Sequence, residues 1–225
     1  MLEWRILVVM KQLVCLCVFV VLLSSCAMHT PDASAFMEVF DKEYSKDWRG
    51  SGAGYVCVRG GNYTEKMWAI PSYWDIGGNV AFFDYFVVGF SYQWLPIINL
   101  GVGNRFIAWR GWIDFLSLLG DLDQFNYGTG LVQQVIPTEN FRFGFEENFT
   151  HNYVAPYSKS EFEDNDYWEW ALGVFSRYRV STDKTVRSVS LSFRVQRRFF
   201  DSYRMSKYGK YLYSLSLTVT WADKK

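Results

Sequence analysis

Residues 211–221 alternate apolar and polar side chains with a period of two, and this pattern restricts the possible folds more than any other feature. The odd positions are Tyr, Tyr, Leu, Leu, Val and Trp, whereas four of the five even positions are Ser or Thr. Successive side chains of a β-strand point to opposite faces, so this segment predicts a strand with one apolar and one polar face. Aromatic residues occupy both ends of the apolar face, namely Tyr211, Tyr213 and Trp221.

The same alternation recurs upstream and predicts about eight strands in total. They lie at 53–59, 79–94, 98–110, 125–136, 141–150, 167–180, 186–200 and 208–221. Long and short connections alternate, with the long ones near 60–78, 111–124 and 151–166. Transmembrane barrels have long extracellular loops, short periplasmic turns and an even number of strands. The body therefore resembles small outer-membrane β-barrels, which implies an antiparallel up-and-down barrel with both termini in the periplasm.

The end of the chain also resembles the assembly signal of outer-membrane barrels. Ser214, Ser216, Val219 and Trp221 stand where that family has a polar residue, a Gly, an apolar residue and a terminal aromatic residue. Ser216 replaces the usual Gly, and Ala-Asp-Lys-Lys follows Trp221, where many members of the family end. The resemblance implies a bacterial outer-membrane location.

The two faces of the predicted strands differ in a way that favours lipid on the apolar side. Ten residue steps of ~3.3 Å, tilted by ~40°, cover ~25 Å, which is the height of the apolar band of an outer-membrane barrel. The opposite face carries charged residues, which a soluble core rarely accepts unless they are paired. We expect these residues to form a charge cluster in the lumen, and they are Arg105, Arg142, Glu146, Glu169, Arg177, Arg179 and Arg194.

The predicted width of the barrel leaves little space for a pore. An eight-stranded interior is just wide enough for side chains, so we expect ion pairs and small residues to fill it. Alternation is equally compatible with a soluble antiparallel barrel or sandwich, in which the charged face meets water. Residues 112–119 fit either a short apolar helix in a loop or a further strand.

The amino-terminal part of the chain carries a separate signal. Lys11 precedes an apolar run from Leu13 to Leu23, which is shorter than the ~20 residues of a transmembrane helix and typical of a secretory signal peptide. Leu23-Ser24-Ser25-Cys26 resembles the lipobox of bacterial lipoproteins. The resemblance implies that the signal is removed before Cys26, and that this residue carries a diacylglycerol and an amino-terminal acyl chain such as palmitate.

These observations predict three parts of the chain. Residues 1–25 are a lipoprotein signal peptide, in which 1–9 are an upstream mis-start because Met10-Lys11 is a typical opening. Residues 26–50 contain the lipidated cysteine and a tether that leads to the folded part. Residues 51–225 form the β-barrel domain.

The remaining polar residues predict no catalytic, cofactor or metal site. Small outer-membrane lipid A deacylases place a His, a Ser and an acid at the barrel rim, but His151 lacks the His-x-Ser pairing because position 153 is Tyr. The acidic stretch 158–166 does not have the ligand spacing of an EF-hand. Cys57 is the single cysteine after Cys26 and is predicted to be a small apolar filler on a strand.

Taken with the charge balance, these features predict a lipid-anchored outer-membrane β-barrel with a structural or surface-binding role. Lys and Arg total 23, as do Asp and Glu, which argues against a nucleic-acid partner. The expected partner is outer-membrane lipid, which contacts acylated Cys26 and the barrel exterior. One alternative is a lipoprotein whose soluble β-domain binds a small apolar ligand, and a second is an enzyme that modifies outer-membrane lipid.

Overall fold

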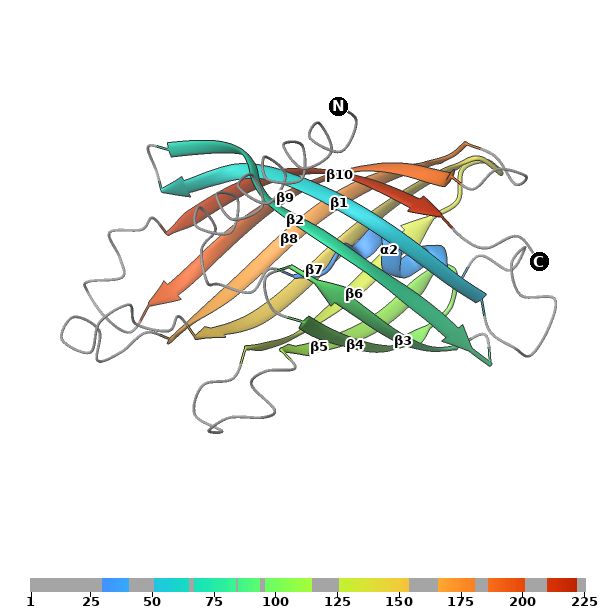
Figure 1. Cartoon of the computed structure of the whole chain (residues 1–225), viewed down its shortest axis with the longest axis horizontal. Helices are drawn as coiled ribbons and strands as arrows, with labels where there is room; N and C mark the ends of the chain where they lie inside the picture. The colour runs from blue at the N-terminus through green and yellow to red at the C-terminus, as the bar shows by residue number, and fades with distance from the viewer. Residues whose placement is uncertain are drawn as a thin grey trace, which may run out of the picture.

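The described part of the chain folds into a closed barrel of ten antiparallel strands that encloses one short helix (Figure 1). The computed structural model describes residues 30–40, 51–64, 67–83, 85–93, 96–114, 126–153, 166–180, 186–200 and 210–221. The elements are α2 (Ala33–Glu38), β1 (Ser51–Thr64), β2 (Met67–Phe82), β3 (Phe86–Tyr92), β4 (Pro96–Gly103), β5 (Ile107–Asp114), β6 (Tyr127–Val135), β7 (Phe141–Tyr153), β8 (Asp166–Arg179), β9 (Val186–Phe200) and β10 (Tyr211–Trp221).

Each strand pairs with its sequence neighbours, and β1 pairs with β10 to close the barrel. In this last pair Gly54 lies opposite Trp221, and Gly61 lies opposite Ser214. The start of β1 and the end of β10 therefore lie at the same end of the barrel. The topology confirms the predicted antiparallel up-and-down barrel.

The strand number differs from the prediction, because two segments that were expected to be single strands each contain a turn. Phe83 adopts a positive φ of 54° between β2 and β3. Between β4 and β5, the Asn104 side-chain oxygen accepts hydrogen bonds from the backbone N–H groups of Phe106 and Ile107, at 2.8 and 3.2 Å. The predicted strands 79–94 and 98–110 are thus split, which converts about eight strands into ten.

A second correction concerns 60–78, which was expected to be a long extracellular loop. These residues instead extend β1 and form most of β2, with register shifts between Arg59 and Gly61 and between Asn62 and Thr64. Bulges of this kind accommodate glycines within paired strands. Residues 112–114 belong to β5, whereas 115–125 and 154–165 lie outside the described residues.

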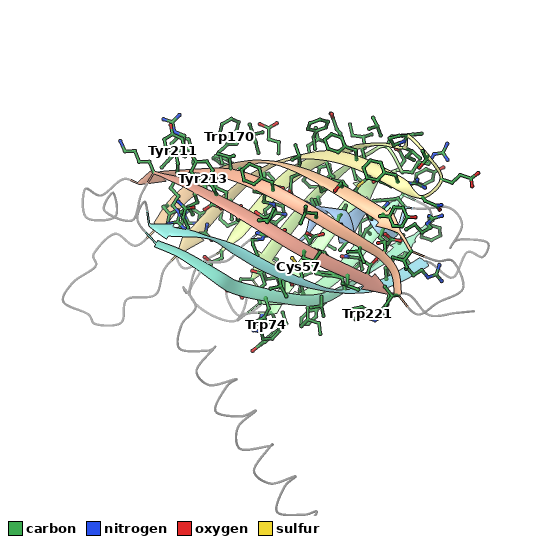
Figure 2. All side chains as sticks on the ribbon, turned by 90° about the horizontal axis from the view of Figure 1, so that it is seen from above. Cys57, Trp74, Trp170, Tyr211, Tyr213 and Trp221 are labelled. Atoms are coloured by element: carbon green, nitrogen blue, oxygen red, sulfur yellow. The ribbon has the colours of Figure 1, made fainter. Side chains whose placement is uncertain are left out.

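The described strands turn apolar side chains outward and polar side chains inward. In β10, Leu215 and Leu217 are 49 % and 50 % exposed, whereas Ser214 and Ser216 are 8 % and 2 % exposed. Figure 2 shows Tyr211 near one end of the barrel and Trp221 near the other, so aromatic rings occupy both ends of this apolar face. This polarity is the reverse of that of a soluble barrel, whose apolar side chains point inward.

Residues 30–40, which were expected to belong to a tether that leads to the folded part, lie inside the barrel, and we call them the plug. Every plug residue is buried, and α2 occupies the interior in Figure 1. Asp32 caps the helix by accepting a hydrogen bond from the Ala35 backbone N–H at 2.9 Å. Among the described residues, no helix is both long enough and apolar enough to span a membrane.

Small inward-facing residues make the space that the plug occupies. Phe36 and Met37 belong to an apolar cluster in which the strands contribute Ala53, Ala81, Val87, Ala108, Val132 and Phe175. A Cβ atom at Gly101 would collide with the Phe36 ring. The lumen therefore has an apolar layer around α2, next to a charged layer formed by the strands.

Candidate functional site in the barrel lumen

A buried carboxylate between two guanidinium groups forms the centre of the lumen. Glu146 on β7 accepts a hydrogen bond from Arg110 Nη2 on β5 at 2.9 Å and from Arg194 Nη2 on β9 at 3.0 Å. Arg194 Nε also pairs with the Glu146 carboxylate, and Asn148 Nδ2 donates to it at 2.9 Å. We call Glu146, Arg110 and Arg194 the central ion cluster.

The space for this cluster comes from a glycine on the neighbouring strand. A Cβ atom at Gly173 would lie 2.6 Å from Glu146 Oε1 and 2.9 Å from Arg194 Cγ. All three charged residues are buried, with the Arg110 and Arg194 residues each 1 % exposed and Glu146 2 %. Burial makes each ion costly unless hydrogen bonds satisfy its remaining groups.

The plug supplies several of those hydrogen bonds. Arg110 Nη1 donates to the Pro31 carbonyl oxygen at 2.8 Å. Arg194 donates to the Thr30 carbonyl oxygen at 2.9 Å and to the Pro31 carbonyl oxygen at 3.1 Å. Thr30 and Pro31 precede the helix, and their carbonyl groups need partners when they are buried. The same two arginines therefore hold both the barrel carboxylate and the plug backbone.

A second ion pair holds the other end of the plug. Glu38, the last residue of α2, lies 3.0 Å from Arg177 Nη1 on β8 and accepts a hydrogen bond from Ser188 Oγ on β9 at 2.8 Å. Arg177 also donates to the Ser34 carbonyl oxygen at 2.9 Å. Plug and barrel thus share charged contacts at both ends of the helix.

The seven residues predicted to form a lumen charge cluster fall into separate groups. Glu146 and Arg194 belong to the central ion cluster, and Arg177 contacts the plug through Glu38. Glu169 lies elsewhere in the lumen, where it accepts from Gln196 at 2.9 Å and pairs with Arg198 at 3.5 Å.

The other three of the seven are Arg142, Arg179 and Arg105. Arg142 is 8 % exposed and donates to the carbonyl oxygens of Thr138 and Glu139 in the connection before β7. Arg179, at the end of β8, is also 8 % exposed. Arg105 differs from the expectation: it is exposed, because residues 104–106 form the connection between β4 and β5. Its guanidinium lies over the Phe106 ring, 4.7 Å from the centroid.

Arg110, Glu38 and Arg59 are among the side chains that contact the plug or the central ion cluster and that the sequence analysis did not assign to the lumen. If 98–110 formed one uninterrupted strand, as predicted, the Arg105 side chain would point inward and the Arg110 side chain outward. The connection at 104–106 reverses this, so that Ala108, Arg110 and Trp112 are buried. Asn104 followed by charged Arg105 is the signal that would have located the turn. Glu38 was missed because its segment was predicted to be a tether.

The remaining candidates from the sequence lie in separate surroundings. Cys57 is fully buried, and its Sγ atom lies 3.9 Å from Asp32 Oδ2. His151 stacks on Tyr127 at 5.1 Å and contacts the Trp168 ring at 4.7 Å between centroids. Cys26 and residues 158–165 lie outside the described residues. Within the described ranges, no three His, Cys, Asp or Glu residues are grouped to hold a metal ion.

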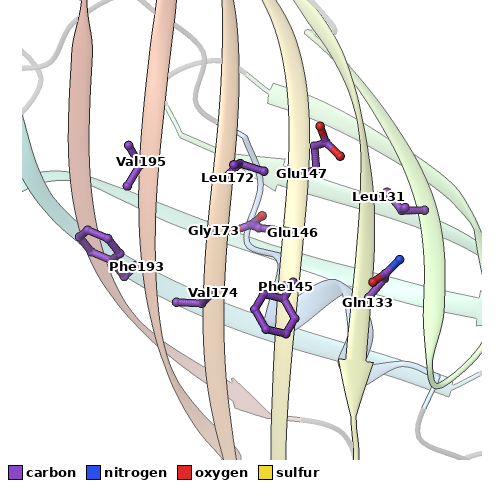
Figure 3. Close-up of a pocket in the computed structure, with 10 residues that line it drawn as sticks. All are labelled: Leu131, Gln133, Phe145, Glu146, Glu147, Leu172, Gly173, Val174, Phe193 and Val195. Carbon is purple, nitrogen blue, oxygen red and sulfur yellow. The ribbon is translucent and has the colours of Figure 1, made fainter.

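The outer wall carries a hollow of about 440 Å³ over β6, β7, β8 and β9 (Figure 3). Its apolar lining includes Leu131, Phe145, Leu172 and Phe193, all of which are exposed on the outer face. Glu147 also lines it, midway along β7, and its carboxylate accepts a hydrogen bond from Trp170 Nε1 at 2.9 Å. Glu146 and Glu147 are adjacent carboxylates that point to opposite sides of the barrel wall.

The central ion cluster predicts that substitutions at Glu146 and at Glu147 have very different effects on the stability of the protein. We expect Glu146→Gln to lower the free energy of unfolding by ~3–5 kcal/mol, because it leaves Arg110 and Arg194 as uncompensated buried charges. Glu147→Gln is the matched control and should not lower the free energy of unfolding, since Glu147 faces outward and its loss leaves no lumen arginine unpaired. Urea unfolding in lipid vesicles measures both, and equal stability of the two variants would contradict the buried cluster.

No family model and no curated protein matches the chain. Among solved structures, it is similar to the amino-terminal β-barrel domain of Pseudomonas aeruginosa OprF, with 9 % identity, a TM-score of 0.33, and coverage of 77 % of this chain and 100 % of that chain. It is also similar to the Acinetobacter baumannii outer membrane protein Omp33, with 6 % identity, a TM-score of 0.26, and coverage of 79 % and 100 %. Likenesses this low carry no argument about the function of this chain.

Proposed function

We propose that this chain is a lipid-anchored outer-membrane β-barrel whose lumen is closed by its own plug, with a structural or surface-binding role. The observation that supports it best is the polarity of the wall, which is apolar outside and charged inside. The exposed outer side chains include Val102, Trp109, Phe145, Leu172, Leu191, Phe193, Leu215 and Leu217. In water so many exposed apolar side chains would drive association.

A closed barrel also meets the main requirement of the bilayer. Lipid offers no hydrogen bonds, so each backbone N–H and C=O group in the apolar region needs a partner within the protein. Pairing of β1 with β10 removes the free edges of the sheet. The soluble alternative needs an apolar interior for its small apolar ligand, whereas the lumen centre holds the central ion cluster. The wall polarity therefore favours the membrane-spanning proposal.

The plug is the reason to propose a role other than a pore. Ten strands enclose a wider space than the predicted eight, and α2 with its ion pairs occupies it. The apolar ring of Phe36 lies among inward-facing strand residues, and Glu38 is bound to Arg177. We propose no catalytic role: in the described part of the chain, His151 packs against the rings of Tyr127 and Trp168 at the carboxyl-terminal end of β7.

The lipid anchor is proposed from the lipobox-like residues 23–26. An acyl chain and a membrane-spanning barrel are two membrane attachments in one chain. The anchor is therefore not needed for retention in the membrane. We propose that it fixes the amino-terminal segment that precedes the plug.

The membrane-spanning proposal predicts a position-dependent cost for charge on the outer face. In lipid vesicles, Leu217→Arg should lower the free energy of unfolding by ~2–4 kcal/mol, because Leu217 lies midway along the apolar stripe. Val186→Arg, at the start of β9, is the matched control and should cost ~0–1 kcal/mol near the interface. Fluorescence quenching by brominated lipid gives a second measurement. A fluorophore attached at position 217 should be quenched, whereas the same fluorophore at position 216 should not be quenched. A fluorophore at 217 that brominated lipid leaves unquenched would falsify the proposal.

The lipid anchor predicts that Cys26→Ala abolishes acylation and leaves uncut precursor. Metabolic labelling with a palmitate analogue measures the first effect, and the electrophoretic size of the chain measures the second. Cys57→Ser is the matched control and should keep full labelling, because Cys57 is buried inside the barrel. Undiminished label on Cys26→Ala would refute the anchor.

The closed lumen predicts that the wild-type protein does not conduct ions in planar bilayers. Glu38→Arg places a cation against Arg177, so like charges should expel the plug and open a conductance. Glu38→Gln keeps the side-chain volume without the repulsion and should conduct less than Glu38→Arg. Steady wild-type channels above the protein-free background would show that the plug does not close the lumen.

A further inference from the structure

The direction of the plug inside the barrel is fixed by the order of its contacts along β9. Thr30 and Pro31 bind Arg194, Ser34 hydrogen-bonds Ser190, and Glu38 accepts from Ser188. As the plug residue number rises from 30 to 38, the β9 residue number falls from 194 to 188. The plug therefore runs antiparallel to β9.

β1 gives the same direction independently. Arg59 Nη2 donates to the Thr30 carbonyl oxygen at 3.5 Å, and Cys57 lies beside Asp32. β1 starts at the end of the barrel that also holds Trp221. Two strands on opposite sides of the closing strand β10 thus agree that Thr30 points away from that end and that Phe40 points toward it.

The two ends of the barrel differ in their connections. The short-turn end holds the connections 83–85, 104–106, 136–140 and 180–185, the start of β1 and the end of β10. The long-loop end holds two short connections, 65–66 and 93–95, and the three longest connections between the described strands, which are 115–126, 154–165 and 201–210. By the usual asymmetry of outer-membrane barrels, the long-loop end faces the cell exterior.

We propose that the amino-terminal segment is threaded through the lumen from the long-loop end, so that acylated Cys26 lies on the cell-surface side of the outer membrane. This inference rests on the proposed anchor and on the proposed membrane-spanning barrel. It departs from the expectation that both termini share the periplasmic side. The carboxyl-terminal strand still ends at the short-turn end, and the two ends of the mature chain lie on opposite sides.

The length of chain before the plug excludes the other route. Thr30 lies four residue steps after Cys26, so the chain between them spans at most ~14 Å when fully extended. Thr30 is level with Thr150, because their short side chains bring the two Oγ1 atoms within 3.4 Å. Thr150 is nine residues from Phe141 at the short-turn end of β7, or ~30 Å along the strand, and three residues from Tyr153 at the long-loop end, or ~10 Å. The tilt of ~40° reduces these distances to ~23 Å and ~8 Å along the barrel axis, so the available chain reaches the long-loop end and falls short of the other. The plug itself also occupies that part of the lumen.

Thr30 and Pro31 are the point at which the threaded segment is held. Their two carbonyl groups bind three arginines from β1, β5 and β9, namely Arg59, Arg110 and Arg194. Tension on the lipidated end would therefore act on charge-assisted hydrogen bonds, which are stronger than neutral ones. In this arrangement the outer leaflet holds the acyl chains and the central ion cluster holds the plug.

Paired cysteines in a Cys57→Ser background test the direction of threading. Thr30 Oγ1 lies 3.4 Å from Thr150 Oγ1, and Ser34 Oγ is hydrogen-bonded to Ser190 Oγ. The pairs Thr30→Cys with Thr150→Cys and Ser34→Cys with Ser190→Cys should each cross-link on oxidation in the full-length protein.

Exchanged pairs are the control for that experiment. Thr150 is level with Arg198 on β9, because both lie opposite Glu169 on β8. It is therefore eight residues from Ser190, or ~26 Å along the strand, well beyond disulfide reach. Thr30→Cys with Ser190→Cys, and Ser34→Cys with Thr150→Cys, should lack the cross-link. Cross-linking of the exchanged pairs in place of the matched pairs would reverse the direction and overturn the proposal.

Epitope accessibility on intact cells tests the side of the membrane. Three variants each carry the same epitope at a different position. The first has it between Ala27 and Met28, the second after Ser160 between β7 and β8, and the third after Lys225. The first two should bind antibody on intact cells, and the third should bind only after permeabilisation. An epitope at 27–28 that behaves like the one after Lys225 would overturn the threading.

The same experiment separates this inference from the proposals on which it rests. If the chain carries no palmitate label but the epitope at 27–28 is still accessible on intact cells, the lipid-anchor proposal is refuted and the threading proposal stands. If the epitopes after Ser160 and after Lys225 are instead found on the same side of the membrane, the proposal of a membrane-spanning barrel is refuted.

Discussion

The ion pairs of Glu146 with Arg110 and Arg194 are the constraint on which the rest of the lumen depends. The three residues come from β7, β5 and β9, so the cluster connects strands on facing parts of the wall. One carboxylate does not satisfy two guanidinium groups, and the remaining N–H donors need oxygen acceptors. The carbonyl groups of Thr30 and Pro31 accept three hydrogen bonds from these donors. The plug therefore helps to satisfy the cluster, and the cluster satisfies two backbone carbonyl groups of the plug.

The number of strands and the presence of the helix are connected through the width of the barrel. An eight-stranded lumen is filled by strand side chains alone, whereas ten strands leave space that needs further atoms. The helix is short because the charged layer begins where it starts: Asp32 caps it next to Pro31, which binds Arg110 and Arg194. Glycine and alanine on the inner wall accommodate Phe36, so apolar packing adds to the ionic contacts.

The sequence predicted the closed antiparallel barrel and the orientation of β10, since alternation with small inward residues is a local property. It did not predict ten strands, because Phe82 and Phe86 keep the period-two apolar spacing across one connection and Phe106 keeps it into the other. The error at 104–106 also placed Arg105 inward and left Arg110 unassigned. The plug was missed for a different reason. Six helical residues are too few to show a period, and their stability comes from contacts more than a hundred residues away.

These distant contacts also restrict the order in which the barrel assembles. Thr30 binds Arg194 across 164 residues, and Ser34 binds Ser190 across 156 residues, both on the strand next to β10. Insertion of the plug after β1 has paired with β10 would require buried ions to separate inside a closed wall, at a cost of several kcal/mol for each ion. Placement of the plug before closure lets the arginines of β1, β5 and β9 bind it while the sheet is open. Closure by β10 is then the step that both removes the sheet edges and traps the amino-terminal segment.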